Sequence, residues 1–312
     1  MAKTKRPVVA VSVGDLNGIG IEIALKSHKK IAQYVQPVYC ICEEMLDQAC
    51  NRLGLERPED MMLFPVSGEF KIKPGVISNK SGLYSYNSFK KAIKLCERKI
   101  ADALVTLPIH KEAWFLAGVD YKGHTDMLRN HFDKEAIMML GCDKMYVALY
   151  TEHMPLKDVA ASIKTERLYR FFLDLQKDIK ADTVAVLGLN PHAGDGGVLG
   201  DEETKITKAI KKANKKLKKE LFKGPMVPDT AFTRDMRYQY KHYVAMYHDQ
   251  GLIPLKALHF DESINVSLNL PIIRTSVDHG TAFDIAYKKR RASTKSYINA
   301  VLAARDQVIK KG

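Results

Sequence analysis

Short apolar runs rich in β-branched residues recur along the chain, and each ends in a cluster of glycine, proline, histidine, asparagine or aspartate. VVAVSV leads into GDLNGIG, DALVTL into PIHKEA, and YVALYT into EHMPL. Later in the chain, TVAVLGL leads into NPHAGDGG, and YVAMY leads into HDQGLIP. Apolar runs of this length that stop at turn-forming residues predict buried β-strands.

Amphipathic stretches lie between most of these runs, for example IEIALKSHKKI and SYNSFKKAIKLCERKI. Alternating strands and helices predict an α/β fold whose sheet is mainly parallel and covered on both faces. In such sheets, ligands bind beyond the carboxyl ends of the strands, which is where the polar clusters stand. We expect the single chain, residues 1–312, to fold as two interleaved α/β lobes with a cleft between them.

The composition is that of a globular protein and excludes several classes. The chain is 46% hydrophobic, and its apolar runs all fall short of the roughly 18 residues that span a bilayer. Its start, MAKTKRPVVAVSVGD, lacks the apolar stretch and cleavage site of a signal peptide, so we expect a cytoplasmic location without membrane partners. The five cysteines are scattered without a C-x-x-C pair, which argues against a disulfide framework or a structural zinc knot.

Much of the net charge of +13 lies in one segment, residues 203–222. Its apolar residues recur at helical spacing and predict a helix whose other faces carry the lysines; they are Ile206, Ile210, Ala213, Leu217 and Leu221. A solvated helix face is the simpler interpretation. A nucleic-acid surface is the alternative, although aromatic residues that would stack on bases do not interleave with these lysines.

Three of the ten histidines stand at predicted strand ends beside proline, glycine or carboxylates: His153, His192 and His248. A catalytic metal takes three protein ligands and keeps a position open for water or substrate. Imidazole favours Zn²⁺ or Co²⁺, and the nearby carboxylates suit Mg²⁺ or Mn²⁺. Taken singly, each histidine is more often a hydrogen-bonding or capping residue than a ligand.

The chain has no standard nucleotide-binding fingerprint. GDLNGIG lacks the third glycine of G-x-G-x-x-G, because position 23 is isoleucine, and no P-loop sequence occurs. SVDHGTAFDIA, residues 276–286, is the candidate loop for a nicotinamide cofactor, because His279, Gly280 and Thr281 offer backbone donors and a stacking ring to an adenosine phosphate. The alternative is a helix start with Thr281 as N-cap and Asp284 at N3, and helix starts also bind anions.

An anionic substrate would find suitable partners in four places: GHTD at residues 123–126, Lys256, Asn265 and Arg274. Arginine binds phosphate or carboxylate in a bidentate manner, and lysine adds a compact charge. Each of these residues taken singly is more often a surface salt-bridge partner.

Together these motifs resemble those of the 4-hydroxythreonine-4-phosphate dehydrogenase family of vitamin B6 biosynthesis. They are GDLNGIGIE, TLPIHKEA, GHTD, NPHAGDGGVLGDEE, MYHDQGLIPLK and IRTSVDHGTAFDIA, in family order from near residue 12 to near residue 286. The resemblance implies a fold similar to isocitrate and isopropylmalate dehydrogenases, which lack the Rossmann motif. It also implies a homodimer whose active sites lie at the subunit interface.

The resemblance assigns roles to particular residues. The cofactor it implies is NAD or NADP, contacted by the loop that holds His279, Gly280, Thr281 and Asp284. One divalent metal per site, Zn²⁺, Co²⁺ or Mg²⁺, would be held by His153, His192 and His248. The implied substrate contacts are His124, Thr125, Lys256, Asn265 and Arg274, and the acidic positions of the family's site match Asp229 and Asp249.

The chain departs from the family pattern at several motif positions. Leu16 and Asn17 stand where proline and alanine are usual, and Ile21 stands where proline is usual. His110 replaces a common asparagine. Tyr287 replaces a glycine in the cofactor loop, so it bears on the choice between NAD and NADP.

The implied reaction is NAD(P)-dependent oxidation of the C3 alcohol of 4-phosphooxy-L-threonine. The resulting 3-oxo acid loses CO₂ and leaves 3-amino-2-oxopropyl phosphate. Asp249 and Lys256 are the candidates for the general base. The alternative substrate is threonate or erythronate 4-phosphate, and the alternative class is a basic protein that binds nucleic acid.

Overall fold

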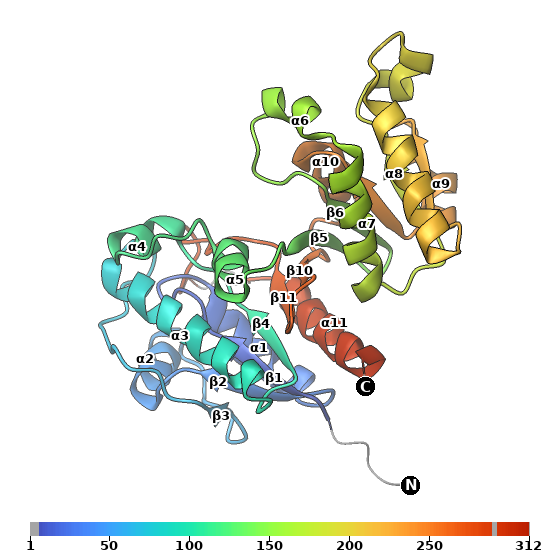
Figure 1. Cartoon of the computed structure of the whole chain (residues 1–312). Helices are drawn as coiled ribbons and strands as arrows, with labels where there is room; N and C mark the ends of the chain where they lie inside the picture. The colour runs from blue at the N-terminus through green and yellow to red at the C-terminus, as the bar shows by residue number, and fades with distance from the viewer. Residues whose placement is uncertain (1–5, 289–291, 312) are drawn as a thin grey trace, which may run out of the picture. The chain divides into compact units, whose positions relative to one another are not determined.

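A computed structural model describes residues 6–288 and 292–311 (Figure 1). The basic start of the chain, residues 1–5, and the segment 289–291 lie outside the described residues. The chain forms two compact units. Unit 1 consists of residues 1–134, 264–266 and 270–312, and unit 2 consists of residues 135–263 and 267–269.

Unit 1 contains parallel strands in the order β3-β2-β1-β4-β11. β4 and β11 are buried throughout, because both faces of this sheet are covered. α3 packs against β1, β2 and β4, while α11 packs beside α1 and against β1, β4 and β11. The strands are β1 (Val8–Ser12), β2 (Gln36–Cys40), β3 (Met62–Leu63), β4 (Ala103–Thr106) and β11 (Ile273–Val277). The helices are α1 (Gly20–Ile31), α2 (Glu43–Leu53), α3 (Asn79–Glu97), α4 (Lys111–Leu116), α5 (His124–Phe132) and α11 (Lys295–Lys311).

Unit 2 contains strands in the order β5-β6-β9-β7-β8, parallel except for the pair β5–β6. α10 packs against β5, β6 and β9, and α7 packs against α8. The strands are β5 (Ile137–Cys142), β6 (Met145–Leu149), β7 (Val184–Leu187), β8 (Phe222–Met226) and β9 (His242–Ala245). The helices are α6 (Leu156–Ser162), α7 (Thr165–Asp178), the 3-10 segment η1 (Pro191–Gly197), α8 (Glu202–Leu217), α9 (Arg234–Gln239) and α10 (His248–His259). The residues of β10 (Ile264–Leu268) are divided between the two units.

The predicted α/β architecture with a mainly parallel sheet is confirmed. Each of the five apolar runs forms a strand, namely β1, β4, β6, β7 and β9. The antiparallel pair β5–β6 follows from local sequence, because only Asp143 and Lys144 separate the two strands, and so short a connection makes a hairpin.

The helix predicted over residues 203–222 was extended too far, because α8 ends at Leu217. Lys218 adopts a left-handed backbone, with φ of 52°, and ends the helix there. The side chain of Asn214 then holds the following strand: its Nδ2 donates to the carbonyl of Phe222 at 2.9 Å, and its Oδ1 accepts from the Phe222 N–H at 3.0 Å. Leu221 therefore lies in the connection to β8 and is not part of the apolar stripe of α8.

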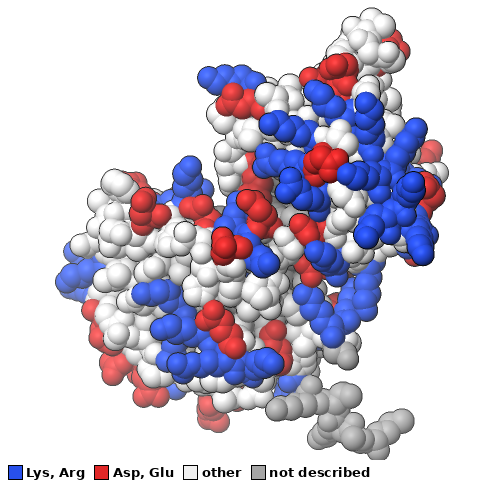
Figure 2. Space-filling model, in the orientation of Figure 1, with Lys and Arg blue, Asp and Glu red and all other residues white. Residues whose placement is uncertain are grey.

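The lysines of α8 lie on its exposed faces, and Figure 2 shows basic side chains gathered over this helix. Some of this charge is balanced locally, since the Lys212 ammonium lies 2.6 Å from a carboxylate oxygen of Glu166. Within residues 6–288 and 292–311, none of the helices combines the length and apolar character needed to cross a membrane. All five cysteines are free and buried.

Gly251 allows α10 to lie directly on the sheet of unit 2. A β-carbon at this position would be 2.5 Å from Cγ1 of Val147 and 2.8 Å from Cβ of Ala245. Both neighbours belong to strands of the unit 2 core, β6 and β9, so they have little room to move.

We therefore expect Gly251→Val to lower the free energy of unfolding by about 3 kcal/mol, the upper end of overpacking costs. Gly280→Ala is the matched control, because a β-carbon there would have no neighbour within 4 Å and its expected change is within about 0.5 kcal/mol. Urea unfolding of both variants provides the measurement. Equal stabilities would show that α10 does not depend on close approach at Gly251.

Candidate active site

The sequence-predicted site residues fall into two sets, one in each unit. In unit 1, Arg274 lies in β11, which runs parallel to β4, and Asn265 lies in β10. His279 follows β11, and His124 begins α5. In unit 2, His248 follows β9 and begins α10.

His124 has a buried imidazole held between two aromatic rings. Its ring centre lies 4.5 Å from that of Phe89 and 5.6 Å from that of Trp114, both in edge-to-face arrangements. Burial and the positive charge of Arg274 lower the pKa of His124 well below its ordinary value, so the imidazole is neutral at pH 7. Its Nε2 is buried and has no hydrogen-bond partner among the described residues. A neutral ring nitrogen in this position is suited to bind a polar group of a ligand.

Arg274 and Asn265 are further buried polar groups of unit 1. Arg274 is 2% exposed, and its Nη2 donates a hydrogen bond to Oγ1 of Thr106 at 2.7 Å. Burial lowers the pKa of Arg274 to about 9, which still leaves the guanidinium charged at neutral pH. The side-chain oxygen of Asn265 is buried without a hydrogen-bond donor in the part of the chain that the structure describes. This set offers a cation and an acceptor to a ligand that carries both an anion and a donor. Thr125, beside His124, is also buried.

The cofactor loop, residues 279–287, packs on the first sequence motif. The carbonyl of Thr281 accepts a hydrogen bond from the Ile19 N–H at 3.0 Å. A β-carbon on Gly18 would lie 2.7 Å from that same carbonyl oxygen, so only glycine permits this approach. The glycines of GDLNGIG therefore serve chain packing here. His279 keeps its Nε2 buried without a hydrogen-bond partner among the described residues.

The alternative interpretation of this loop, a helix capped by Thr281 with Asp284 at N3, is wrong. Residues 283–287 form turns, with hydrogen bonds of the i to i+3 type from Ile285 to Ala282 and from Lys288 to Ile285. Ala282 and Tyr287 have left-handed backbones, with φ of 44° and 57°, which a right-handed helix cannot accommodate. Asp284 is exposed in this turn.

The departures from the family pattern make contacts that support one another. The Tyr287 hydroxyl donates to the carbonyl of Leu16 at 2.8 Å. Asn17 uses both ends of its side chain on the 73–76 loop, accepting from the Lys73 N–H at 2.8 Å and donating to the Val76 carbonyl at 2.7 Å. The ring of His110 stacks on Phe283 of the cofactor loop, with ring centres 4.8 Å apart. Tyr287 and His110 thus hold the cofactor loop in place, while Asn17 holds the 73–76 loop.

A pocket of about 550 Å³ opens beside this loop. Two basic side chains contribute to it, Arg52 from α2 and Lys288 from the end of the loop. The remaining lining residues are Pro74, Gly75, Phe283, Ala286 and Tyr287. Its aromatic walls and two cations are suited to an aromatic ligand that carries negative charge.

Asp15, a residue the motif analysis did not single out, is a fully buried carboxyl at the end of β1. It accepts hydrogen bonds from the Asn17 N–H at 2.9 Å and the Ser81 hydroxyl at 3.1 Å. Burial nevertheless dominates and raises the pKa of Asp15 to about 6. The shift is caused by burial, and Ser81 and His110 near the carboxyl come from distant parts of the sequence, so the local motif does not reveal it.

The raised pKa of Asp15 makes stability depend on pH. The folded protein binds the extra proton between the unfolded pKa of 3.8 and the folded value of about 6, so the free energy of unfolding falls as pH rises through this window. The shift corresponds to about 3 kcal/mol. We expect Asp15→Asn to be more stable than the wild type by an amount that grows from near zero below about pH 4 towards this value above about pH 7. Urea unfolding across this pH range measures it, and a constant difference would contradict the assignment.

In unit 2, His153 and His248 lie next to each other. Their ring centres are 5.6 Å apart and the rings are tilted by 40°. The Nδ1 of His248 lies 2.7 Å from a carboxylate oxygen of Asp249. When Nδ1–H donates to this oxygen, Nε2 carries the lone pair that can bind a metal. Two imidazoles bound to one ion through bonds of about 2 Å place their ring centres about 5 Å apart, so this pair fits two ligand positions.

His192 lies in η1, in a loop whose start is held by hydrogen bonds to Glu203. Residues 192–196 all have left-handed backbones, with φ between 42° and 80°. Glu203 holds the start of this loop, because its carboxylate accepts from the N–H groups of Leu189 and Asn190 at 2.7 and 2.8 Å and from the Asn190 amide at 2.9 Å. Among the described residues, three-ligand groups with all atoms within 4.8 Å of one another do not include His153, His192 or His248.

Gln250 is a positioning residue that the sequence analysis missed. Its Oε1 accepts from the Met246 N–H and its Nε2 donates to the Gly188 carbonyl, both at 2.7 Å. The side chain thereby ties the start of α10, next to His248, to the residue that follows β7. Lys256 lies two turns further along α10, with its ammonium 5.3 Å from the ring centre of Phe260. Asp229 is exposed in a turn after β8.

Polar clusters beyond the strand ends of a mainly parallel sheet are typical of α/β enzymes. Comparison with known proteins identifies the family. Residues 20–304 match the family of the pyridoxal phosphate biosynthetic protein PdxA, so the chain belongs to that family, as the motifs predicted. It is 63% identical over 296 residues to the 4-hydroxythreonine-4-phosphate dehydrogenase of Sulfurimonas denitrificans, covering 95% of this chain and 96% of that protein. Identity to the enzyme of the same name from Campylobacter fetus is 56%, with the same coverage.

Among solved structures, the 4-hydroxythreonine-4-phosphate dehydrogenase of Klebsiella pneumoniae is similar over the whole chain. The TM-score is 0.82 at 31% sequence identity, with 97% of this chain and 99% of that chain covered. The similarity therefore extends over both units and is not confined to the sequence motifs.

Proposed function

We propose that this protein is a 4-hydroxythreonine-4-phosphate dehydrogenase that acts in pyridoxal phosphate biosynthesis. Its 63% identity to a protein of that name, over nearly the full length of both chains, carries the proposal. The reaction is the oxidation of the C3 alcohol of 4-phosphooxy-L-threonine by NAD or NADP. The 3-oxo acid so formed loses CO₂ and leaves 3-amino-2-oxopropyl phosphate.

The unit 1 residues bind and orient the substrate in this proposal. The buried guanidinium of Arg274 holds an anionic group. Lys256, on α10, is a further proposed substrate contact. Asn265 accepts a hydrogen bond from an amino or hydroxyl group, which satisfies its buried oxygen. The neutral His124 and the neighbouring Thr125 position the substrate's polar groups. Asp249 and Lys256 are the proposed proton acceptors for the alcohol.

The unit 2 histidines bind a divalent cation, Zn²⁺, Co²⁺ or Mg²⁺. The spacing of His153 and His248 and the carboxylate of Asp249 behind His248 support this assignment, with His192 proposed as the third ligand. When bound, the cation polarises the alcohol and later the carbonyl oxygen, and the nicotinamide accepts the hydride. Asp249 fixes the His248 ring so that its Nε2 faces a ligand.

The cofactor loop holds NAD or NADP, through His279, Gly280, Thr281 and Asp284. The buried Nε2 of His279 and the open space beside Gly280 support this placement. We assign the adenosine end of the cofactor to the 550 Å³ pocket beside the loop, because Phe283 and Tyr287 offer stacking surfaces.

If this assignment holds, Arg52 and Lys288 face the adenosine ribose, where NADP carries an additional phosphate. We expect Arg52→Ala to raise the KM for NADP by about tenfold and the KM for NAD much less, since one phosphate contact to a charged group is worth about 1.5–3 kcal/mol. Steady-state kinetics with both cofactors measure the ratio. Lys30→Ala on α1 is the control. Equal effects on both cofactors would place the 2′-phosphate elsewhere.

We further propose that the chain works as a homodimer, as the family resemblance implies. Light scattering coupled to gel filtration measures the mass directly.

For the substrate, NAD(P)H formation with 4-phosphooxy-L-threonine should exceed that with threonate or erythronate 4-phosphate. A higher kcat/KM for either sugar-acid phosphate would overturn the substrate assignment while leaving the dehydrogenase assignment intact.

A further inference from the structure

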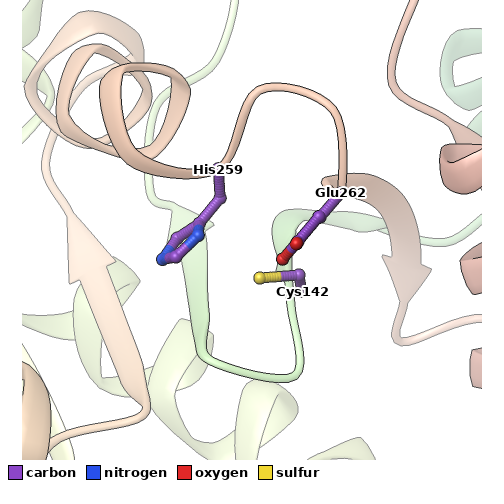
Figure 3. A group of neighbouring side chains, drawn as sticks. All are labelled: Cys142, His259 and Glu262. Carbon is purple, nitrogen blue, oxygen red and sulfur yellow. The ribbon is translucent and has the colours of Figure 1, made fainter.

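Three side chains with metal-binding atoms converge at the end of α10 that is opposite His248. Figure 3 shows Cys142, His259 and Glu262 directed towards one another. Cys142 ends β5, His259 ends α10, and Glu262 lies in the turn that follows. One ligand atom from each residue lies within 4.8 Å of the other two.

We propose that Cys142, His259 and Glu262 form a second metal site, which binds Zn²⁺ or Co²⁺ and leaves a fourth position for water. A thiolate, an imidazole and a carboxylate together are a ligand set that favours these ions over Mg²⁺. Bonds of about 2.0–2.3 Å in a tetrahedral site place neighbouring ligand atoms about 3.3–3.8 Å apart. Because the ligand atoms already lie within 4.8 Å of one another, they need to approach by at most about 1.0–1.5 Å. The thiol loses its proton to solvent as the metal binds.

The backbone around this Cys142 site already holds the ligands in place. The carbonyl of His259 accepts hydrogen bonds from the N–H groups of Glu262 at 3.2 Å and Ser263 at 3.1 Å, which closes the turn. Cys142 is 5% exposed, so its sulfur is shielded from bulk solvent.

Lys144 is the group that opposes binding, and it provides the sharpest test. Its ammonium lies 3.0 and 3.4 Å from the two carboxylate oxygens of Glu262. The Lys144 side chain is 65% exposed, so it has room to move into solvent when a cation takes its place. A bound ion would connect the C-terminal end of α10 to the β5–β6 hairpin, and α10 begins with His248. The second site would thus steady the helix that carries the proposed catalytic ligand.

The test is a Co²⁺ titration of the intact protein under reducing conditions, followed by absorption. Thiolate-to-cobalt charge transfer in the near ultraviolet reports only on cysteine ligation, so cobalt at the histidines of the proposed active site does not contribute. The outcome is therefore independent of the proposed dehydrogenase activity. We expect this band in the wild type and its loss in Cys142→Ser.

Two further variants complete the design. His259→Ala should weaken cobalt binding by about a hundredfold, and Lys144→Met should strengthen it by about tenfold because the competing cation is gone. Ligand atoms of Cys42, Glu44 and Glu69 also lie within 4.8 Å of one another, so Cys42→Ser tests whether cobalt binds there instead, and it should leave the band unchanged. Cys50→Ser is the matched control, since Cys50 is also buried but belongs to neither of these two groups. A band that survives Cys142→Ser overturns the proposal. So does the absence of a band up to millimolar cobalt in both the wild type and the well-folded Lys144→Met variant.

Discussion

Replacing His248 with alanine should reduce turnover by more than about 100-fold while leaving the fold intact. His248 is the first residue of α10, just after β9, and its ring centre lies 5.6 Å from that of His153, so its loss would remove one of two adjacent proposed ligands. Loss of an outer carboxylate partner alone costs about 10–100-fold in metal sites, and loss of a ligand costs more. The measurement is kcat at saturating substrate, together with metal content and circular dichroism.

Asp249→Asn tests whether the carboxylate behind His248 supports metal binding, without removing the His248 side chain itself. The amide keeps the shape of the carboxylate but weakens the hold on Nδ1 of His248, so we expect a loss of about 10–100-fold that added metal partly restores. His131→Ala is the matched control for His248→Ala, because His131 also pairs with a carboxylate, through its Nε2 to Glu97 at 2.8 Å, but lies outside the proposed site. An unchanged kcat in His248→Ala would remove His248 from the mechanism.

Replacing Arg274 with alanine should raise the KM for the phosphorylated substrate by about 30- to 4,000-fold with a smaller effect on kcat. Truncating one member of a buried charge pair costs about 2–5 kcal/mol, and each 1.4 kcal/mol is a factor of ten. The pair in this proposal is Arg274 with the anionic group of the substrate, and the Arg274 side chain is buried because it is only 2% exposed. Substrate saturation curves separate the two kinetic constants.

Two companion variants define what Arg274 does. Arg274→Lys keeps the charge but loses the planar fork, so its KM should lie between those of the wild type and Arg274→Ala. Arg305→Ala, on α11 with its guanidinium 2.6 Å from Asp306, is the control for removing a partly buried arginine. A folded Arg274→Ala protein with an unchanged KM would show that another group binds the substrate anion.

The parts of the site that sequence predicts best are those at strand ends. The run YVAMY followed by HDQG placed His248 at the end of β9, because a parallel sheet brings such residues to one edge. The five predicted strands are present for the same reason: apolar runs buried on both faces leave a strong local signal.

Residues that act through distant partners leave no such signal. Gln250 hydrogen-bonds to the backbones of Met246 and Gly188, which are far apart in sequence. No residue spacing along the chain predicts that contact. The titration of Asp15 depends on burial by neighbours from other elements. The end of α8 was missed because Asn214 binds the backbone of Phe222, a tertiary contact that overrides the helical spacing of Leu221.

The family pattern alone also left the role of its departures open. Tyr287 takes a left-handed backbone where glycine is usual, and its hydroxyl binds the carbonyl of Leu16, another departure. His110 likewise stacks on Phe283 of the same loop. The substituted residues contact one another or the same loop in the folded protein. A single sequence does not show these contacts, because the residues lie far apart along it.

The most direct test of the proposed chemistry is NAD(P)H formation from 4-phosphooxy-L-threonine by the purified protein, before and after removal of divalent metal with a chelator. The proposed metal site at His153, His192 and His248 predicts rapid formation of NAD(P)H before treatment, loss of activity after it, and recovery when Zn²⁺, Co²⁺ or Mg²⁺ is returned. Full activity in protein shown by elemental analysis to contain no metal would contradict that chemistry.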